Sequence, residues 1–218
     1  MRKSSLSEDT LLRMLVAAIA ETIARLALLR TAGNFEQALK VIDQNLQELL
    51  GLKADIVRQL DDSQIVEMLT TNDFLDVARL YHVAEIFRQE GEIRNELGQT
   101  AKAQNCQARA LNLYLEVCFA VENDFLEADD RIDELFDALG ANTPEDTLFI
   151  TFDYYEQVGA FDRAEASINR MLQATGNNPE LLAEKRSFYE RLLEESDEEL
   201  EAGGVNRDQI ERELRKIR

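Results

Sequence analysis

The chain has 218 residues, of which 24 are basic and 43 acidic, so its formal net charge at pH 7 is −19. A charge of this sign and size repels phosphate backbones and anionic lipid head groups, which argues against binding to nucleic acid or to a membrane surface. Apolar residues make up 45% of the chain and helix breakers are few, with nine Gly and two Pro, so the composition predicts one all-α domain over residues 1–218.

The first two elements form a predicted helical hairpin. Apolar residues recur at helical spacing over residues 8–31, and a second apolar stripe covers 35–51. The break between them, Gly33 and Asn34, is so short that the two helices are expected to be antiparallel. The apolar run Met14–Ala20 has only seven residues and charged flanks, so it predicts neither a signal peptide nor a membrane span.

Glycine, proline and capping residues divide the rest of the chain into further helices, so that about ten are expected in all. Their predicted limits are 53–60, 63–70, 73–97 with Asp73 as cap, 99–121, 124–139, 145–158, 161–175 and 179–201. A last short helix, capped by Asn206 or Asp208, is expected as a loosely attached segment within 203–218. No segment alternates with the period of a strand, so no sheet is predicted.

The acidic residues gather in the middle of the chain and in its C-terminal half. Residues 122–146 hold ten acidic residues and one basic residue, Arg131. Within this stretch Asp129, Asp130 and Asp133 resemble the motif with which prenyl-transferring enzymes hold Mg²⁺ and a diphosphate. Those enzymes need a second such motif and a basic clamp, which this chain lacks. We therefore interpret the stretch as a solvated helix face.

Residues suited to nucleophilic catalysis or metal binding are few. His82 is the only histidine, which excludes a catalytic triad with His and a metal site with two His from one chain. Cys106 and Cys118 lie twelve residues apart on one predicted helix, about 18 Å along its axis, which is too far for a disulfide. Reduced thiols of this kind predict a cytoplasmic protein.

A short signature recurs at three predicted helix corners. It begins at Gly33, Gly98 and Gly159, which are 65 and 61 residues apart, and an Ala follows each Gly five residues later. The first and third copies also share a Phe and an acidic residue between the Gly and the Ala. Gly permits a tight turn, the aromatic ring wedges between two helices, and the small Ala lets their backbones approach, so each copy predicts a helical hairpin.

The signature resembles the tetratricopeptide repeat (TPR), a helical hairpin of about 34 residues. Three stretches match it in part: 19–52 at Gly33, Phe35 and Ala38, 84–117 at Gly91, Ala103 and Ala110, and 145–178 at Tyr155, Ala164 and Ile168. Segments 11–14, 47–52 and 90–93 also resemble an uncharacterised bacterial TPR-like family of unknown function. The resemblance implies a right-handed array of antiparallel hairpins, a degenerate TPR-like superhelix.

The same resemblance implies that the first helix of each repeat lines a concave groove. The positions that would face this groove are Glu85, Arg88, Glu92, Asn95, Glu96, Asp146, Phe149, Asp153, Glu156 and Gln157. Because most of them are acidic or polar, the expected partner is a basic or amphipathic protein segment. We therefore expect a non-catalytic scaffold for protein–protein interaction that uses no metal or cofactor.

Two other functions remain open. A self-associating structural protein would bury Phe149, Tyr154 and Tyr155 in a homodimer. An enzyme on a helical bundle would need His, Cys or paired carboxylates that converge on a pocket.

Overall fold

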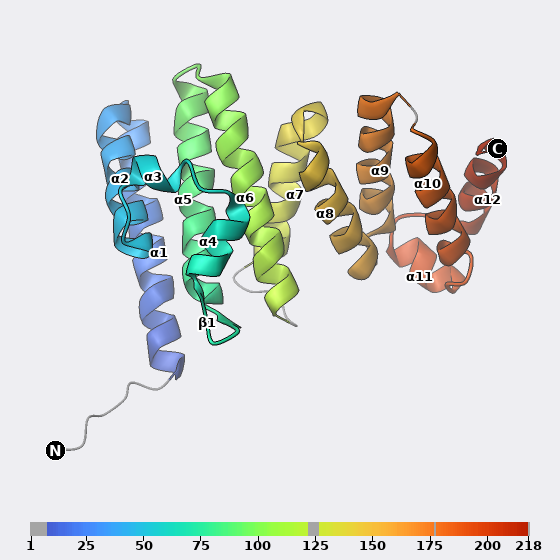
Figure 1. The fold of residues 1–218 in the computed structure, drawn as a ribbon, viewed down its shortest axis with the longest axis horizontal. Coiled ribbons are helices and arrows are strands. Elements are labelled where there is room, and N and C mark those ends of the chain that lie inside the picture. Colours follow the sequence, from blue (N-terminus) through green and yellow to red (C-terminus); the bar gives the residue numbers. More distant parts are fainter. Residues whose placement is uncertain (1–7, 122–126, 177, 218) are drawn as a thin grey trace. The chain divides into compact units, whose positions relative to one another are not determined.

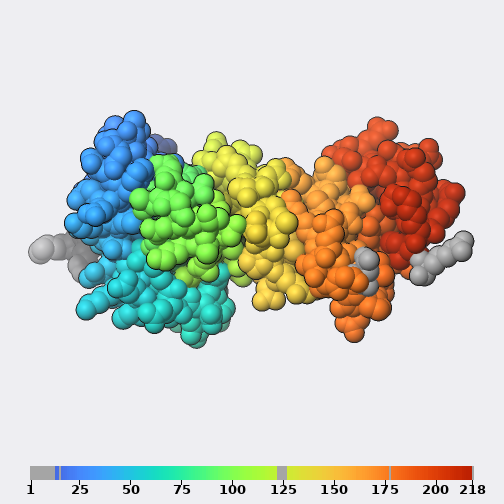
Figure 2. Space-filling model, turned by 90° about the horizontal axis from the view of Figure 1, so that it is seen from above, coloured from blue at the N-terminus to red at the C-terminus, as the bar shows by residue number. Residues whose placement is uncertain are grey.

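The computed structural model describes residues 8–121, 127–176 and 178–217. Within these ranges the chain forms twelve α-helices, one 3-10 helix and two very short strands (Figure 1), which confirms the prediction of an all-α helical array. The chain divides into two compact units, Met1–Leu139 and Gly140–Arg218, called here the N-terminal unit and the C-terminal unit. Side chains fill the spaces between neighbouring helices within each unit on the face shown in Figure 2. None of the described helices is both long enough and apolar enough to span a membrane.

The bounds of the elements are as follows. The N-terminal unit contains α1 (Glu8–Thr31), α2 (Phe35–Leu50), α3 (Ala54–Val57), α4 (Asp62–Met68), β1 (Thr70–Thr71), β2 (Phe74–Leu75), α5 (Val77–Glu96), α6 (Thr100–Ala120) and α7 (Ala128–Leu139). The C-terminal unit contains the 3-10 helix η1 (Gly140–Asn142), α8 (Glu145–Gln157), α9 (Phe161–Thr175), α10 (Pro179–Leu192), α11 (Asp197–Ala202) and α12 (Arg207–Lys216).

The three glycines of the repeated signature lie at the corners between α1 and α2, α5 and α6, and α8 and α9, as predicted. Each has a φ near +70° and lies in the left-handed region. At each corner the amide after the Gly donates a hydrogen bond back over five residues, as from Gln99 N to Arg94 O at 2.8 Å. The same bond pattern at all three corners is the Schellman motif, in which Gly satisfies the last carbonyls of a helix.

The helices of each hairpin approach closely through small side chains. Ala38, Ala103 and Ala164, the last residues of the three signature copies, are all buried. At Gly91 a Cβ atom would lie 2.9 Å from Gln107 Cγ and 3.2 Å from Ala103 O across the α5–α6 contact. A larger residue at this position would push the two helices apart, so the fold requires a small residue there.

The prediction of no sheet and the predicted start of the long helix are wrong. Residues 70–75 form a hairpin in which Thr70 pairs with Leu75 and Thr71 with Phe74. Its turn places Asn72 and Asp73 at φ of 52° and 65°, a conformation that Asn and Asp tolerate better than most residues. Asp73 is therefore part of a turn, and the helix begins at Val77.

The predicted long helix over 179–201 is also wrong, because it is two helices. The first ends at Leu192, and Ser196 begins the second through a capping box with Glu199. The helix predicted over 124–139 begins at Ala128, and residues 124–126 of that prediction lie outside the described part of the chain.

The C-terminal helix α12 is held by specific contacts. Arg207 donates hydrogen bonds to Leu193 O at 2.8 Å and to Glu195 O at 2.6 Å. Asn206 caps the helix by accepting a bond from Gln209 N at 2.9 Å, and Ile210 is buried.

Candidate functional site

Five of the ten predicted groove residues lie on α5, where the most N-terminal of them is buried. Glu85 is 1% exposed, and its carboxylate accepts hydrogen bonds from Arg88, Gln89 Nε2 at 3.0 Å and Tyr114 Oη at 2.6 Å. Burial alone would raise the pKa of Glu85, but the hydrogen bonds and charge of Arg88 and the bond from Tyr114 outweigh it and lower that pKa. Glu85 therefore stays ionised inside the unit and offers no free surface to a partner.

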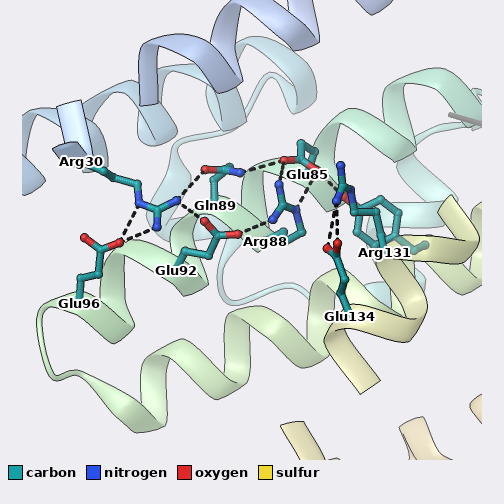
Figure 3. Close-up of polar contacts among 9 residues, drawn as sticks. Arg30, Glu85, Arg88, Gln89, Glu92, Glu96, Arg131 and Glu134 are labelled. Carbon is teal, nitrogen blue, oxygen red and sulfur yellow. Dashed lines mark hydrogen bonds and ion pairs between the residues drawn. The ribbon is translucent and has the colours of Figure 1, made fainter. Parts of the chain in front are cut away.

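The other two acidic residues of the predicted α5 set, Glu92 and Glu96, are paired with an arginine from α1. Arg30 binds Glu96 through Nη2 at 2.5 Å and through Nε at 3.0 Å, and it also forms an ion pair with Glu92. Arg88 binds Glu92 from the other side, so a chain of alternating charges runs along α5 (Figure 3). The face of α5 that was expected to be an open acidic wall is thus occupied by two arginines.

Two further polar residues, Asn95 and Arg131, lie near this part of α5. Asn95 is exposed, as is its neighbour Glu96. Arg131 of α7, which the prediction did not include, pairs with Glu134 at 3.0 Å on its own helix (Figure 3).

The other five predicted residues lie on α8 and are open to solvent. Asp146, Phe149, Asp153 and Gln157 are exposed, and Glu156 is partly exposed. Their spacing of three or four residues places them on one side of the helix. Phe149 keeps 41% of its surface exposed, although α8 buries Leu148, Phe152 and Tyr155 on its other side. The structure thus brings an exposed aromatic ring and several carboxyl groups together on α8.

The exposed side of α8 continues onto α10. Arg191 binds both carboxylate oxygens of Glu156, at 2.6 and 2.8 Å, and also contacts Glu184 at 3.0 Å. Burial, together with the charges of Glu156 and Glu184, raises the pKa of Asp153, and the Arg191 charge only partly offsets this. Burial is the largest cause of this shift, and the two neighbouring carboxylates, Glu156 and Glu184, add to it.

A cavity of about 450 Å³ adjoins this face. Its lining residues are Glu156, Gln157, Val158, Gly159, Phe161, Arg191, Leu192, Glu195, Glu199 and Ala202. Val158 is 54% exposed, so apolar surface is available at the rim as well as at Phe149. We call the exposed side of α8, with Glu184 and Arg191 of α10, the α8 face.

The residues with catalytic potential are in environments that suppress reactivity. His82 is 5% exposed, neither ring nitrogen has a hydrogen-bond partner among the described residues, and burial lowers its pKa, so the imidazole is neutral at pH 7. Burial and the Glu90 charge raise the pKa of the Cys106 thiol to about 12, which keeps it protonated.

The acidic motif of α7 is exposed, whereas two of the three aromatic residues expected at a homodimer interface are buried. Asp129 and Asp130 are exposed, and no cluster of three or more His, Cys, Asp or Glu that could hold a metal occurs among the described residues. Tyr154 and Tyr155 are 4% and 2% exposed, so both belong to the core of the C-terminal unit. Of the three aromatic residues expected at a homodimer interface, Phe149 is the exposed one.

Comparison with known proteins gives one match. Residues 5–218 match the model of a family described as a family of unknown function, DUF6483. No curated protein and no solved structure matches the chain.

Proposed function

This chain belongs to DUF6483, a family of unknown function, and from its geometry we propose that it is a non-catalytic scaffold whose α8 face binds a basic, amphipathic protein segment. The TPR resemblance supports this proposal, since arrays of helical hairpins commonly present such faces to peptides. The three matching glycine corners supply the local geometry on which that resemblance depends.

The observation that carries the proposal is the combination of Phe149 with uncompensated negative charge. An exposed aromatic ring can anchor an apolar side chain of a partner, and aromatic anchors contribute most of the affinity at many interfaces. Asp146 and Asp153 lie three and four residues from it on the same side of α8. A partner helix that carries Lys or Arg beside an apolar residue would satisfy both features.

Selective loss of binding tests the proposal. Affinity capture from the native cell would compare the wild-type chain with the double variant Phe149→Ala, Asp153→Lys and with the control Phe74→Ala. Phe74 is 81% exposed on the β-hairpin of the N-terminal unit, so the control removes an exposed ring from another surface. We expect a partner that the control retains and that the double variant binds at least about tenfold more weakly.

Ionic strength provides the second arm of the test. Interactions between exposed charges weaken as salt shortens the screening length, so affinity should fall between about 50 mM and 500 mM NaCl. A partner whose affinity is the same at both concentrations, or that binds the double variant as tightly as the wild type, would contradict recognition by the α8 face.

Self-association is a second candidate, and a different helix favours it. Along α1, Met14 is 58% and Leu28 is 73% exposed, and several exposed alanines accompany them. Such a surface can pack against a second copy of itself. Light scattering should then show a dimer that Leu28→Glu dissociates; a monomeric wild-type chain would exclude this candidate.

A further inference from the structure

A second cavity, on the N-terminal unit, combines an apolar floor with several cations. It has a volume of about 450 Å³ and lies between α3, α5 and α6. Arg58, Arg94, Arg109 and Lys102 line it, although the chain as a whole carries a net charge of −19. Neither the α8 face nor the paired charges around Arg30 include these residues.

A buried carboxylate holds two of the arginines in place. Glu90 is fully buried and accepts hydrogen bonds from Arg58 Nε at 2.9 Å and from Arg94 Nε at 2.6 Å. Arg58 also binds Asp43 at 2.6 Å through Nη2, while its Nη1 donates no hydrogen bond to any described residue and forms a longer ion pair, at 3.6 Å, with the exposed carboxylate of Asp55. The Nη1 group therefore keeps donors available, on a guanidinium whose orientation is already set.

The third cation has no partner of its own. Lys102 is exposed at the edge of the cavity and forms no hydrogen bond or ion pair with the described residues. Two negative charges, those of Glu90 and Asp43, compensate Arg58 and Arg94, and the Asp55 side chain is 93% exposed, so the unpaired positive charge at the wall is that of Lys102. The wall formed by Arg58, Arg94 and Lys102 thus retains positive charge.

The floor of the cavity is apolar and rigid. The ring of Phe87 is fully buried, and the guanidinium of Arg109 lies 4.4 Å from its centroid. Arg109 donates hydrogen bonds to Asp62 at 2.8 Å and to Leu60 O at 2.8 Å. These bonds hold its guanidinium against the ring, so it is not free to bind a ligand. Cys106 lies beside the ring as a protonated thiol, which adds apolar surface and no charge.

We propose that this cavity binds a small organic carboxylate, with the carboxylate against Arg58, Arg94 and Lys102 and the apolar body against Ala101 and Cys106. Arginine donors that are already oriented suit a carboxylate, because their hydrogen bonds are charge-assisted and little side-chain entropy is lost on binding. The volume is in the range of small-molecule sites, which are typically apolar with a few fixed polar groups. The proposal is independent of protein binding at the α8 face.

Isothermal titration of the full-length chain with benzoate and hexanoate tests the proposal, with benzamide and hexanamide as neutral analogues and inorganic phosphate as an anion without an apolar body. We expect one of the carboxylates to bind with a Kd of about 1 mM or tighter. Its amide and phosphate should each bind at least about tenfold more weakly, because each lacks one of the two features that the site recognises.

Matched variants locate the binding. Lys102→Gln should weaken carboxylate binding about five- to tenfold, whereas Lys40→Gln makes the same charge change on the exposed side of α2 and should leave it unchanged. Ala101 is exposed at the edge of the cavity, so Ala101→Phe should block entry without disturbing the core. The absence of saturable binding by both carboxylates, equal binding of acid and amide or of phosphate, or equal affinity in Lys102→Gln and Lys40→Gln would each overturn the proposal.

Discussion

At the scale of single residues, the N-terminal unit buries two titratable side chains that differ in their hydrogen bonding. Glu85 is surrounded by donors that stabilise its charge, whereas His82, one helical turn earlier on α5, has no partner for either ring nitrogen within the described part of the chain. Ionised Glu85 therefore contributes to stability, and a charged His82 would oppose it.

His82 predicts a loss of stability in mild acid. Because its folded-state pKa is below the ordinary 6.5, the unfolded chain gains a proton first as the pH falls through 6.5, and the free energy of unfolding decreases. The loss from this residue should approach about 1.4 kcal/mol per pH unit below that value. Urea denaturation at pH 7.5 and 5.5 would measure it.

The control for this prediction is His82→Leu, which keeps an apolar side chain of similar size and removes the titration. The pKa values of Glu116 and Asp153 are raised by burial, so these residues oppose the loss, but they do so equally in both proteins. If the variant loses as much stability as the wild type between the two pH values, another group is responsible.

Burial also distinguishes two glutamates that both pair with arginine on α5. Glu85→Gln should cost about 3 kcal/mol, because it leaves the charge of the largely buried Arg88 without its main partner. Glu96→Gln breaks the ion pair with Arg30 at a more exposed position and should cost less than about 1 kcal/mol. Denaturant titration of the two variants would compare them, and equal costs would show that burial is not the deciding factor.

At the scale of elements, the corners that were predicted from glycine differ in what surrounds them. A Cβ atom at Gly98 would meet nothing within 4 Å, so Gly98→Ala adds only the strain of a positive φ, about 1 kcal/mol. A Cβ atom at Gly203, which has an ordinary φ, would lie 2.3 Å from Phe161 Cδ2 and 2.4 Å from Gly159 O. The end of α11 therefore packs directly onto the α8–α9 corner.

Gly203→Ala should consequently destabilise the C-terminal unit by about 3 kcal/mol, through displacement of α11 and loss of the bond from Asp162 N to Gly203 O. Thermal unfolding of Gly203→Ala and Gly98→Ala would test this order. A smaller effect at Gly203 than at Gly98 would mean that the contact is not tight in solution.

The sequence predicts most elements of this fold, because helical periodicity and glycine corners are local signals. It failed at residues 70–75, where the strands have two residues each and the turn uses Asn72 and Asp73 without glycine. It also failed after Leu192, where the break has no Gly or Pro, although Ser196 and Glu199 formed a readable capping box.

The candidate site could be predicted from the sequence only in part, for a different reason. The exposed residues of α8 follow from their spacing, because both Asp146 and Phe149 remain exposed in the described part of the chain. On α5 the outcome depended on Arg30, which is 62 residues from Glu92 and 66 from Glu96 in the sequence. Tertiary pairing over such distances has no local signature.

At the scale of the whole molecule, charge separates the surfaces that can bind a basic partner from those that cannot. The C-terminal unit carries eighteen acidic and ten basic residues, and burial and the charges of Glu156 and Glu184 raise the pKa of Asp153 on the α8 face. In the N-terminal unit Arg30 and Arg88 compensate Glu85, Glu92 and Glu96 of α5, and Arg58 and Arg94 compensate Glu90. This difference is the reason why we propose protein binding at α8 and not at α5.

Hydrogen–deuterium exchange of the full-length chain, with and without a saturating captured partner, tests this assignment most directly. We expect slower exchange in the peptides that cover α8 and α10 in the complex, and unchanged exchange in those of α5 and α6. Protection confined to α5 and α6, or exchange at α8 that the partner leaves unchanged, would contradict the account.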